Sequence, residues 1–544
     1  MFIVHQKCST AVSVLIISLV LFSGNSENAA AAEDKFFFLP YLGAIMGNGV
    51  PSPPSPPAGP VTANIYVPPY QNLFLSGLNP GYYGNGWSDT DIYQLCYDAG
   101  CRSARNTLPD AFLAQWGATI RVNTFRQIVD DLGFKGITTF LQTPREEWRA
   151  TEYYGGSRSK LWQGMYEPIW DSGQNGTPVN DNNRFALYIW YVVKNYGQFI
   201  DFYEIINEPD YTYSSHGWET AGQPGNWWDN MPKPEDLPNL RAPVYHYIRL
   251  LRIAYTVIKQ YDPKGYITPG GLGYQSFLDV LLRNTDNPDG GKVTSTYPLK
   301  GGAYFDTLSM HNYPQYGTRK YENGQWVPDR HSDKAVSVFL GSHQEFAAVL
   351  AKHGYNGVKY PEKPYIITEM NVPRRQIGET LGGIELQRNF TIKAIVKAQM
   401  ADIKLIQWFL TGEGKSYDDP SAGPYDLMGF YENLKITTPG NERITDQGRA
   451  NRITYEQLYG WSYDAGATAA IALPAAVDGA AFMKDGLIRY VLWAKTTTDR
   501  SEDASATINL PEPSYTLVHW NGSSEITSGS NLLLTGTPVF LTPL

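Results

Sequence analysis

The stretch FYEIINEPD, residues 202–210, runs from an apolar segment directly into an asparagine, a glutamate and a proline. A similar transition occurs in PYIITEM, residues 364–370, where an apolar segment leads to Glu369. Short apolar runs rich in β-branched and aromatic residues predict buried β-strands. Each of these two strands therefore ends in a carboxylate, Glu208 in the first and Glu369 in the second.

Similar strand-like runs alternate with amphipathic helical stretches on both sides of these segments. The expected strands are residues 72–78, 101–106, 136–141, 202–209, 265–271, 305–313, 364–370 and 404–410. The expected helices are residues 89–100, 112–132, 184–196, 244–261, 277–283, 335–353, 384–401 and 454–461. Eight strand–helix units in order predict an α/β fold, the (β/α)8 TIM barrel.

In a TIM barrel the carboxyl ends of the strands meet at one rim, from which catalytic side chains project. Glu208 and Glu369 end the fourth and seventh strands, so we expect them at the same rim. Two carboxylates suit cleavage of a glycosidic bond, because one protonates the departing oxygen while the other attacks the anomeric carbon or activates water. A lone glutamate at a strand end is often only a helix cap or an ion-pair partner. The prediction therefore depends on the pair and on the Asn-Glu-Pro triplet.

The runs IINEPD, residues 205–210, and IITEM, residues 366–370, resemble clan A of the glycoside hydrolases. Members of that clan are retaining (β/α)8 enzymes with the acid/base on strand four and the nucleophile on strand seven. Within the clan, the runs FDTLSMHNYPQY, YQSFLDVLL, FYEIINEPD and the tail ending TPVFLTP are most similar to family 39. The chain differs from that family in carrying Ile206 where a tryptophan usually precedes Asn-Glu-Pro.

This resemblance implies a retaining O-glycoside hydrolase that uses a covalent glycosyl-enzyme intermediate, with Glu208 as acid/base and Glu369 as nucleophile. The implied supporting residues are Arg105, which holds the nucleophile; Asn207, which contacts the nucleophile and the sugar 2-hydroxyl; His311 and Tyr313, at the end of strand six; and Trp408, the floor of a sugar subsite.

Electrostatics supports this division of roles. Arg105 and Tyr313 should keep Glu369 ionised, since an opposite charge and hydrogen-bond donors favour a carboxylate. Glu208 must carry a proton to act as an acid. His311 has two possible roles: it donates a hydrogen bond to Glu208 or to a substrate hydroxyl, or it is an orienting core residue. A retaining enzyme needs its two carboxyl groups about 5–5.5 Å apart, and an inverting one about 6.5–9.5 Å. We expect the shorter separation.

The loops after strands three and four contain further candidates for contacts with a sugar. Tryptophan offers a flat apolar face and a polar edge, so one or two can stack on sugars, although packing inside the loops is the better explanation for each one singly. These candidates are Trp162, Trp170, Trp218, Trp227 and Trp228, together with the polar residues His216 and Glu219.

The remaining segments predict export and a second domain. Lys7, an apolar run at residues 11–22 and small residues at 28–32 are typical of a signal peptide. The run is too short to span a bilayer, which takes roughly 20 residues. We therefore expect a secreted or periplasmic protein with a signal peptide at residues 1–32, a Pro-rich segment at 33–61, the barrel at 62–465 and a β-sandwich at 466–544.

Composition excludes several other functions. The net charge is −9 and no basic run occurs, so nucleic acid is not an expected partner. The chain has no metal-binding spacing such as CxxC or HExxH, and no cofactor is expected. Cys96 and Cys101 are open to either a disulfide or two buried thiols.

Two alternatives to a hydrolase are compatible with the same fold. A non-catalytic carbohydrate-binding barrel would be indicated by loss of either glutamate, and both are present. A transglycosylase would use the same residues and differ only in the acceptor that enters the site. Carbohydrate is the expected partner in every case.

Overall fold

The computed structural model describes residues 67, 70, 73–171, 173–174 and 176–544. The signal peptide predicted at residues 1–32 and the Pro-rich segment at 33–61 lie outside the described residues. Among the described residues, no helix combines the length and the apolar character needed to cross a membrane.

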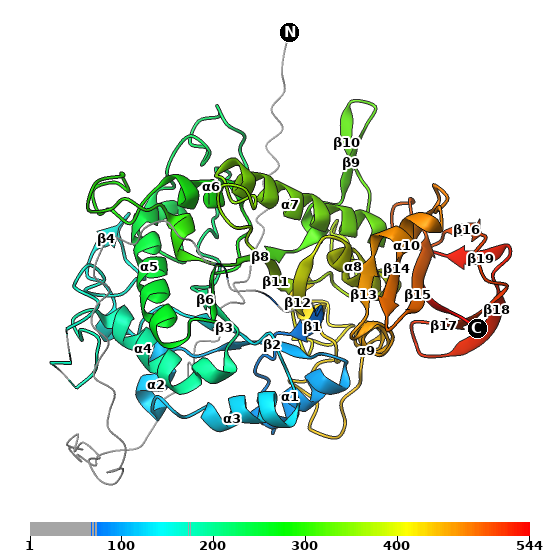
Figure 1. Ribbon diagram of the computed structural model, residues 1–544, viewed down its shortest axis with the longest axis horizontal. Helices are drawn as coiled ribbons and strands as arrows, with labels where there is room; N and C mark the ends of the chain where they lie inside the picture. The colour runs from blue at the N-terminus through cyan, green and yellow to red at the C-terminus, as the bar shows by residue number, and fades with distance from the viewer. Residues whose placement is uncertain (1–66, 68–69, 71–72, 172, 175) are drawn as a thin grey trace. The chain divides into compact units, whose positions relative to one another are not determined.

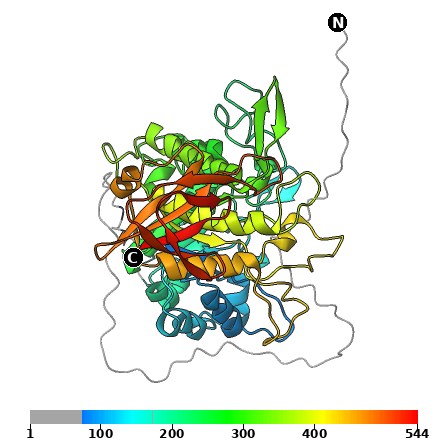
Figure 2. The same ribbon diagram turned by 90° about the vertical axis from the view of Figure 1, so that its right-hand side faces the viewer.

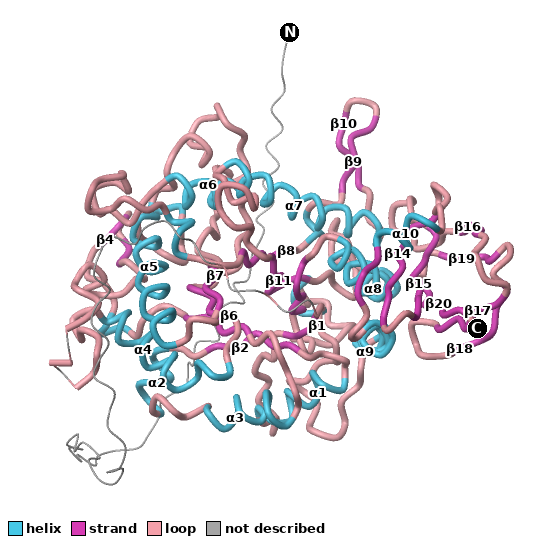
Figure 3. The backbone as a smooth tube through the Cα atoms, viewed as in Figure 1, coloured by secondary structure: helices cyan, strands magenta, loops and turns pink. Residues whose placement is uncertain are grey.

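A sheet of eight parallel strands lies at the centre of the molecule and is ringed by helices (Figure 1 and Figure 3). In chain order the strands are β1 (Leu75–Leu78), β2 (Ser103–Thr107), β3 (Thr138–Leu141), β6 (Phe202–Ile205), β7 (Tyr266–Pro269), β8 (Leu308–Asn312), β11 (Tyr365–Met370) and β12 (Ile403–Trp408). β12 pairs with β1, and a parallel bridge between Leu272 and Met310 joins the β7 side to β8. The predicted (β/α)8 barrel is confirmed, with all eight expected strands present.

The helices around the barrel follow the predicted alternation with two differences. They are α1 (Asp89–Asp98), α2 (Asp110–Trp116), α3 (Val122–Arg126), α4 (Arg184–Tyr196), α5 (Val244–Tyr261), α6 (Gln275–Arg283), α7 (Ser332–Lys352), α8 (Ile384–Met400) and α9 (Asp446–Leu458). The helix expected at 112–132 is divided because Gly117 has a φ of 96°, in the region that favours glycine. The last helix begins at Asp446 rather than at residue 454, because the Thr445 side chain caps it by accepting from the N–H of Gly448.

Two short hairpins that the sequence analysis did not expect extend the loops at the carboxyl ends of the strands. They are β4 (Tyr153–Tyr154) with β5 (Ser157–Arg158), after β3, and β9 (Arg319–Glu322) with β10 (Gln325–Pro328), after β8. The second hairpin projects beyond the surrounding helices (Figure 1). Cys96 and Cys101 are both buried free thiols, which excludes the disulfide.

The β-rich tail forms two sheets that share an apolar core. The larger sheet contains β13 (Ser462–Asp464), β14 (Val477–Lys484), β15 (Leu487–Ala494), β17 (Ser514–Val518), β18 (Ser524–Ser528) and β20 (Val539–Pro543), and the smaller contains β16 (Ser505–Ile508) and β19 (Leu532–Thr535). Residues of both sheets, such as Leu492 and Leu534, are buried in one cluster. The tail is therefore the predicted β domain, although it also carries a short helix, α10 (Ala465–Ala470), that was not expected.

The tail packs directly on the barrel helices. Trp493 on β15 is fully buried and belongs to the same apolar cluster as the barrel core. Its Nε1 donates to Asp333 of α7 at 2.8 Å, and Asp333 also pairs with Lys393 of α8 at 2.8 Å. The strands of the tail, orange to red, lie in front of the barrel in Figure 2.

Deleting residues 466–544 is therefore expected to destabilise the barrel and to lower its soluble yield. The smaller change Trp493→Ala should cost about 3–5 kcal/mol, since it leaves a cavity in the shared core. Thermal melting of both variants measures the effect. Ile526→Ser is a matched control, because Ile526 is 74 % exposed on β18. A truncated barrel with unchanged melting temperature and activity would contradict the prediction.

Candidate active site

Glu208 lies just beyond the end of β6, where the backbone takes unusual conformations. Ile206 and Glu208 have φ values of 59° and 44°, which are uncommon for residues other than glycine. The N–H of Glu208 donates to the carbonyl of Gly270 at 2.5 Å. A Cβ at Gly270 would overlap the carbonyl oxygen of Ile206, so this close approach needs glycine. The strained turn directs Glu208 into the barrel mouth, as strain at functional sites often does.

Glu369 lies on β11 at an irregularity in strand pairing. The register between β11 and β8 shifts between Ile367 and Glu369. A bulge of this kind re-aims side chains, so two consecutive residues can face the same side of a sheet. Thr368 and Glu369 accordingly both bond to groups inside the barrel: Thr368 to Glu204 and Glu369 to Tyr313.

The Glu369 carboxylate has a donor on each oxygen. Nη1 of Arg105 donates to Oε1, and the hydroxyl of Tyr313 donates to Oε2 at 2.6 Å. Burial alone would raise the pKa of Glu369. Electrostatic attraction to His311 and Arg105 and the hydrogen bond from Tyr313 outweigh burial and hold the pKa of Glu369 below its usual range. Glu369 is therefore ionised at neutral pH.

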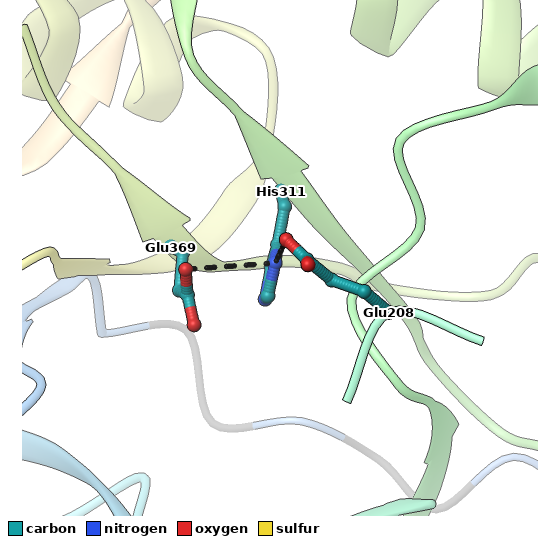
Figure 4. Close-up of side chains that lie close together, drawn as sticks. All are labelled: Glu208, His311 and Glu369. Carbon is teal, nitrogen blue, oxygen red and sulfur yellow. Dashed lines mark hydrogen bonds and ion pairs between the residues drawn. The ribbon is translucent and has the colours of Figure 1, made fainter. Parts of the chain in front are cut away.

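His311 lies between the two glutamates (Figure 4). Its Nδ1 is 2.9 Å from Oε1 of Glu208 and 3.7 Å from Oε2 of Glu369. A carboxylate oxygen of Glu208, one of Glu369 and a ring nitrogen of His311 lie within 4.8 Å of one another. Burial lowers the pKa of His311, but the charge of Glu369 and the hydrogen bond to Glu208 more than compensate and raise it. The side chains of Glu208 and Glu369 stay 23 % and 12 % exposed, so the pair is open to a ligand.

Arg105 connects several of these side chains. Its Nη2 donates to Oδ1 of Asn207 at 2.6 Å, its Nε to Glu204 at 2.6 Å, and its Nη1 to Asn79 at 3.2 Å. The structure thus brings Arg105, Asn207, His311 and Tyr313 together around Glu208 and Glu369.

Trp408 does not lie where the sequence analysis placed it. Its side chain is fully buried, packs against Phe390 and Phe430, and donates from Nε1 to Ser76 at 3.1 Å. Side chains alternate between the two faces of a strand, and position 408 points outward to the helix layer. Trp408 therefore cannot be the floor of a sugar subsite.

The aromatic side chains beside the site come instead from Phe409, Tyr425 and Tyr313. The ring centre of Tyr313 lies 6.1 Å from that of Phe409 and 5.0 Å from that of Tyr425, edge to face in both cases. All three residues are partly exposed. Phe409 follows Trp408 directly, so the alternation of side chains along β12 places Phe409 on the inward side of the strand. That alternation is a sequence signal that could have identified Phe409.

The loop candidates divide by burial. Trp162 and Trp227 are fully buried and have packing roles, whereas Trp170 and Trp228 are half-buried. Trp218 is 70 % exposed, and its ring packs edge-on against Tyr274. The polar candidates bond within their own loop: His216 lies 3.3 Å from Asp236, and Glu219 accepts from Ser215 at 2.7 Å.

Sequence reasoning missed four polar residues inside the barrel. They are Asn79, Glu204, Ser309 and Thr368, all buried and bonded to Arg105, to His311 or to one another. One signal was present for Glu204, because a charged residue in an otherwise apolar buried strand requires a partner.

The described residues contain one group of side chains close enough to share a metal ion, and it consists of Glu208, His311 and Glu369. The guanidinium of Arg105 already bonds to Glu369 there, and its charge opposes a second cation. The donor set therefore fits a proton-transfer site better than a metal site.

No protein-family model and no curated protein matches the sequence. Solved structures do match. A family 39 glycoside hydrolase from the gut symbiont Bacteroides cellulosilyticus WH2 has a TM-score of 0.52 and 14 % identity, over 87 % of this chain and 81 % of its own. A GH30 endoxylanase from Clostridium papyrosolvens C71 has a TM-score of 0.46 and 11 % identity, over 88 % of this chain and 97 % of its own.

At 14 % identity the first match establishes a similar fold, and the TM-score of the second is too low to add to it. The resemblance to clan A and family 39 that the motifs predicted is thereby confirmed at the level of the fold.

Proposed function

We propose that the protein is a retaining O-glycoside hydrolase acting on an oligo- or polysaccharide, with Glu369 as nucleophile and Glu208 as general acid and base. One observation carries the proposal: two glutamates meet at one histidine in the barrel mouth, and only one of them is held by an arginine and a tyrosine. These different surroundings suit the two different roles that glycoside cleavage demands.

In the first step the Glu369 carboxylate attacks the anomeric carbon while Glu208 gives its proton to the departing oxygen. The glycosidic C–O bond breaks, and an ester forms between the sugar and Glu369. Arg105 and Tyr313 keep Glu369 charged and oriented for this attack. His311 bonds to Glu208 at 2.9 Å, so the acid proton stays in a hydrogen bond until it is transferred.

In the second step Glu208 removes a proton from water, which attacks the anomeric carbon and displaces Glu369. Both glutamate side chains are partly exposed, so water can reach them. Two displacements at one carbon restore its original configuration.

The short separation of the glutamates favours retention. One carboxylate oxygen of each glutamate lies within 4.8 Å of the other, which is compatible with the separation of about 5–5.5 Å between the carboxyl groups of a retaining enzyme. Proton NMR of a fresh reaction is therefore expected to detect the retained anomer first. A first product of inverted configuration would exclude the double displacement.

Replacing Tyr313 with phenylalanine is expected to move the acidic limb of the pH profile to higher pH. Glu369 must be ionised to attack, and its pKa is lowered in part by the Tyr313 hydrogen bond. Without this bond the pKa of Glu369 rises, so protonation removes activity at a higher pH than in the parent. The pH dependence of kcat/KM measures the shift. An acidic limb at an unchanged or lower pH would contradict this assignment of the nucleophile.

A transglycosylase would use the same residues with a sugar in place of water. Product analysis with added sugar acceptors separates the two reactions. A purely carbohydrate-binding protein would bind glycans without product formation, and the open glutamate pair does not favour it.

A further inference from the structure

Glu204 is a third glutamate of the site. It lies on β6, four residues before Glu208 along the chain. Its side chain is fully buried on β6. Oε2 accepts from Nε of Arg105 at 2.6 Å. Oε1 accepts from Ser309 at 2.7 Å and from Thr368 at 2.8 Å. A buried carboxylate is expensive unless it is paired and fully hydrogen-bonded, and Glu204 is both.

The two oxygens of Glu204 lead to the two exposed glutamates along separate routes. From Oε2 the route passes through Arg105 to Glu369. From Oε1 it passes through the hydroxyl of Thr368 to Nε2 of His311, at 3.1 Å, and from the same ring to Glu208. One buried side chain is therefore linked to both members of the pair.

The route through Thr368 determines where His311 carries its protons. A hydroxyl has one hydrogen, and the carboxylate of Glu204 can only accept. When Thr368 donates to Glu204, its oxygen must accept from Nε2 of His311, which therefore bears a hydrogen. Nδ1 of His311 then faces Glu208 and shares a single proton with that carboxyl group.

We propose that Glu204 is a positioning residue that holds Arg105 on the nucleophile and fixes the tautomer of His311, so that Glu208 is kept in its proton-donating form. The inference rests on the proposed function and deepens it. Because Glu204 is fully buried, it acts through Arg105, Thr368 and His311.

Glu204→Gln tests the proposal with almost no change of shape. The glutamine oxygen can still accept from Arg105, but its NH₂ group now donates to Thr368. Thr368 then donates to Nε2 of His311, which places the remaining hydrogen on Nδ1. In that state His311 donates to an ionised Glu208, and the general acid has lost its proton.

The expected signature is a leaving-group dependence. Glu204→Gln should lose about 10²-fold in kcat/KM on glycosides with poor leaving groups and less than about tenfold on activated aryl glycosides, because only the former need the acid. The basic limb of its pH profile should move to lower pH. Because the glutamine oxygen still accepts from Arg105, the hold on the nucleophile is kept, and an equal loss on both substrate types would overturn the proposal.

Glu413→Gln is the matched control. Glu413 is also fully buried and paired with an arginine, accepting from Nε and Nη2 of Arg374 at 2.7 Å each. This variant removes the same charge from a comparable ion pair, and the leaving-group dependence should stay that of the parent.

Thr368 supplies a second test that does not disturb the Glu204–Arg105 pair. Thr368→Val removes the hydroxyl and should reproduce the selective loss on poor leaving groups, whereas Thr368→Ser should restore activity. If Thr368→Val affected both substrate types equally, the route to His311 would have no role.

Nitrogen NMR of histidine-labelled protein provides a readout that needs no activity. His311→Asn identifies the signal among the eight histidines. Nε2 of His311 should be protonated in the parent and unprotonated in Glu204→Gln, and an unchanged tautomer would overturn the proposal. If the tautomer differed between the parent and Glu204→Gln as expected, but the parent hydrolysed no glycoside, the proposed function alone would be refuted.

Discussion

Glu369→Ala is expected to lower kcat by about 10⁴-fold or more, since loss of a nucleophile removes the covalent route altogether. The alanine variant retains Arg105 and Tyr313 but has no carboxylate for them to hold. Activated aryl glycosides should not restore turnover, because a better leaving group cannot replace the attacking group. Initial rates and circular dichroism of the purified variant measure activity and folding separately.

Added azide offers a direct check of that variant. The small anion can enter the space left by the Glu369 side chain and attack the anomeric carbon once, giving a glycosyl azide of inverted configuration. Glu385→Ala is a suitable control, because Glu385 is 68 % exposed on α8 and should leave kcat unchanged. Full activity in Glu369→Ala would contradict the proposed mechanism.

Glu208→Ala is expected to have the second largest effect, and a selective one. Loss of a general acid costs about 10²–10⁴-fold on substrates whose leaving group needs a proton. Dinitrophenyl glycosides need none, so their first step should continue and the ester on Glu369 should accumulate. Burst kinetics with these substrates measures that accumulation.

Azide should accelerate the Glu208 variant by replacing the activated water in the second step. Its product should be a glycosyl azide of retained configuration, because Glu369 has already inverted the centre once. A loss of equal size on all leaving groups, with no effect of azide, would exclude Glu208 as the acid/base.

The architecture could be predicted from the sequence because its signals are local. Buried parallel strands read as short apolar runs, and surface helices carry their apolar residues every three or four positions. Eight such pairs allow few arrangements other than a barrel. Two predicted helix boundaries were less accurate. The helix predicted at 112–132 is interrupted at Gly117, and the last barrel helix begins at Asp446 because Thr445 caps it.

The pairing of Glu208 with Glu369 was also within reach of the sequence. Parallel strands point their carboxyl ends to one rim, so two strand-terminal glutamates must approach each other whatever their separation along the chain. The motif resemblance added Arg105, Asn207, His311 and Tyr313, and the structure places all four beside the pair.

The strands, their order along the chain and the two glutamates at the mouth could be predicted, since each depends on residues adjacent along the chain. Which side chains face into the barrel depends instead on how the strands pair in three dimensions. The bulge in β11 turns both Thr368 and Glu369 into the barrel, while alternation along β12 directs Trp408 away from it. The role of Glu204 also depends on the tertiary structure, because its hydrogen bonds to Arg105, Ser309 and Thr368 join residues of four different strands. Contacts of that kind follow from strand register and side-chain direction in three dimensions, which no short stretch of sequence specifies.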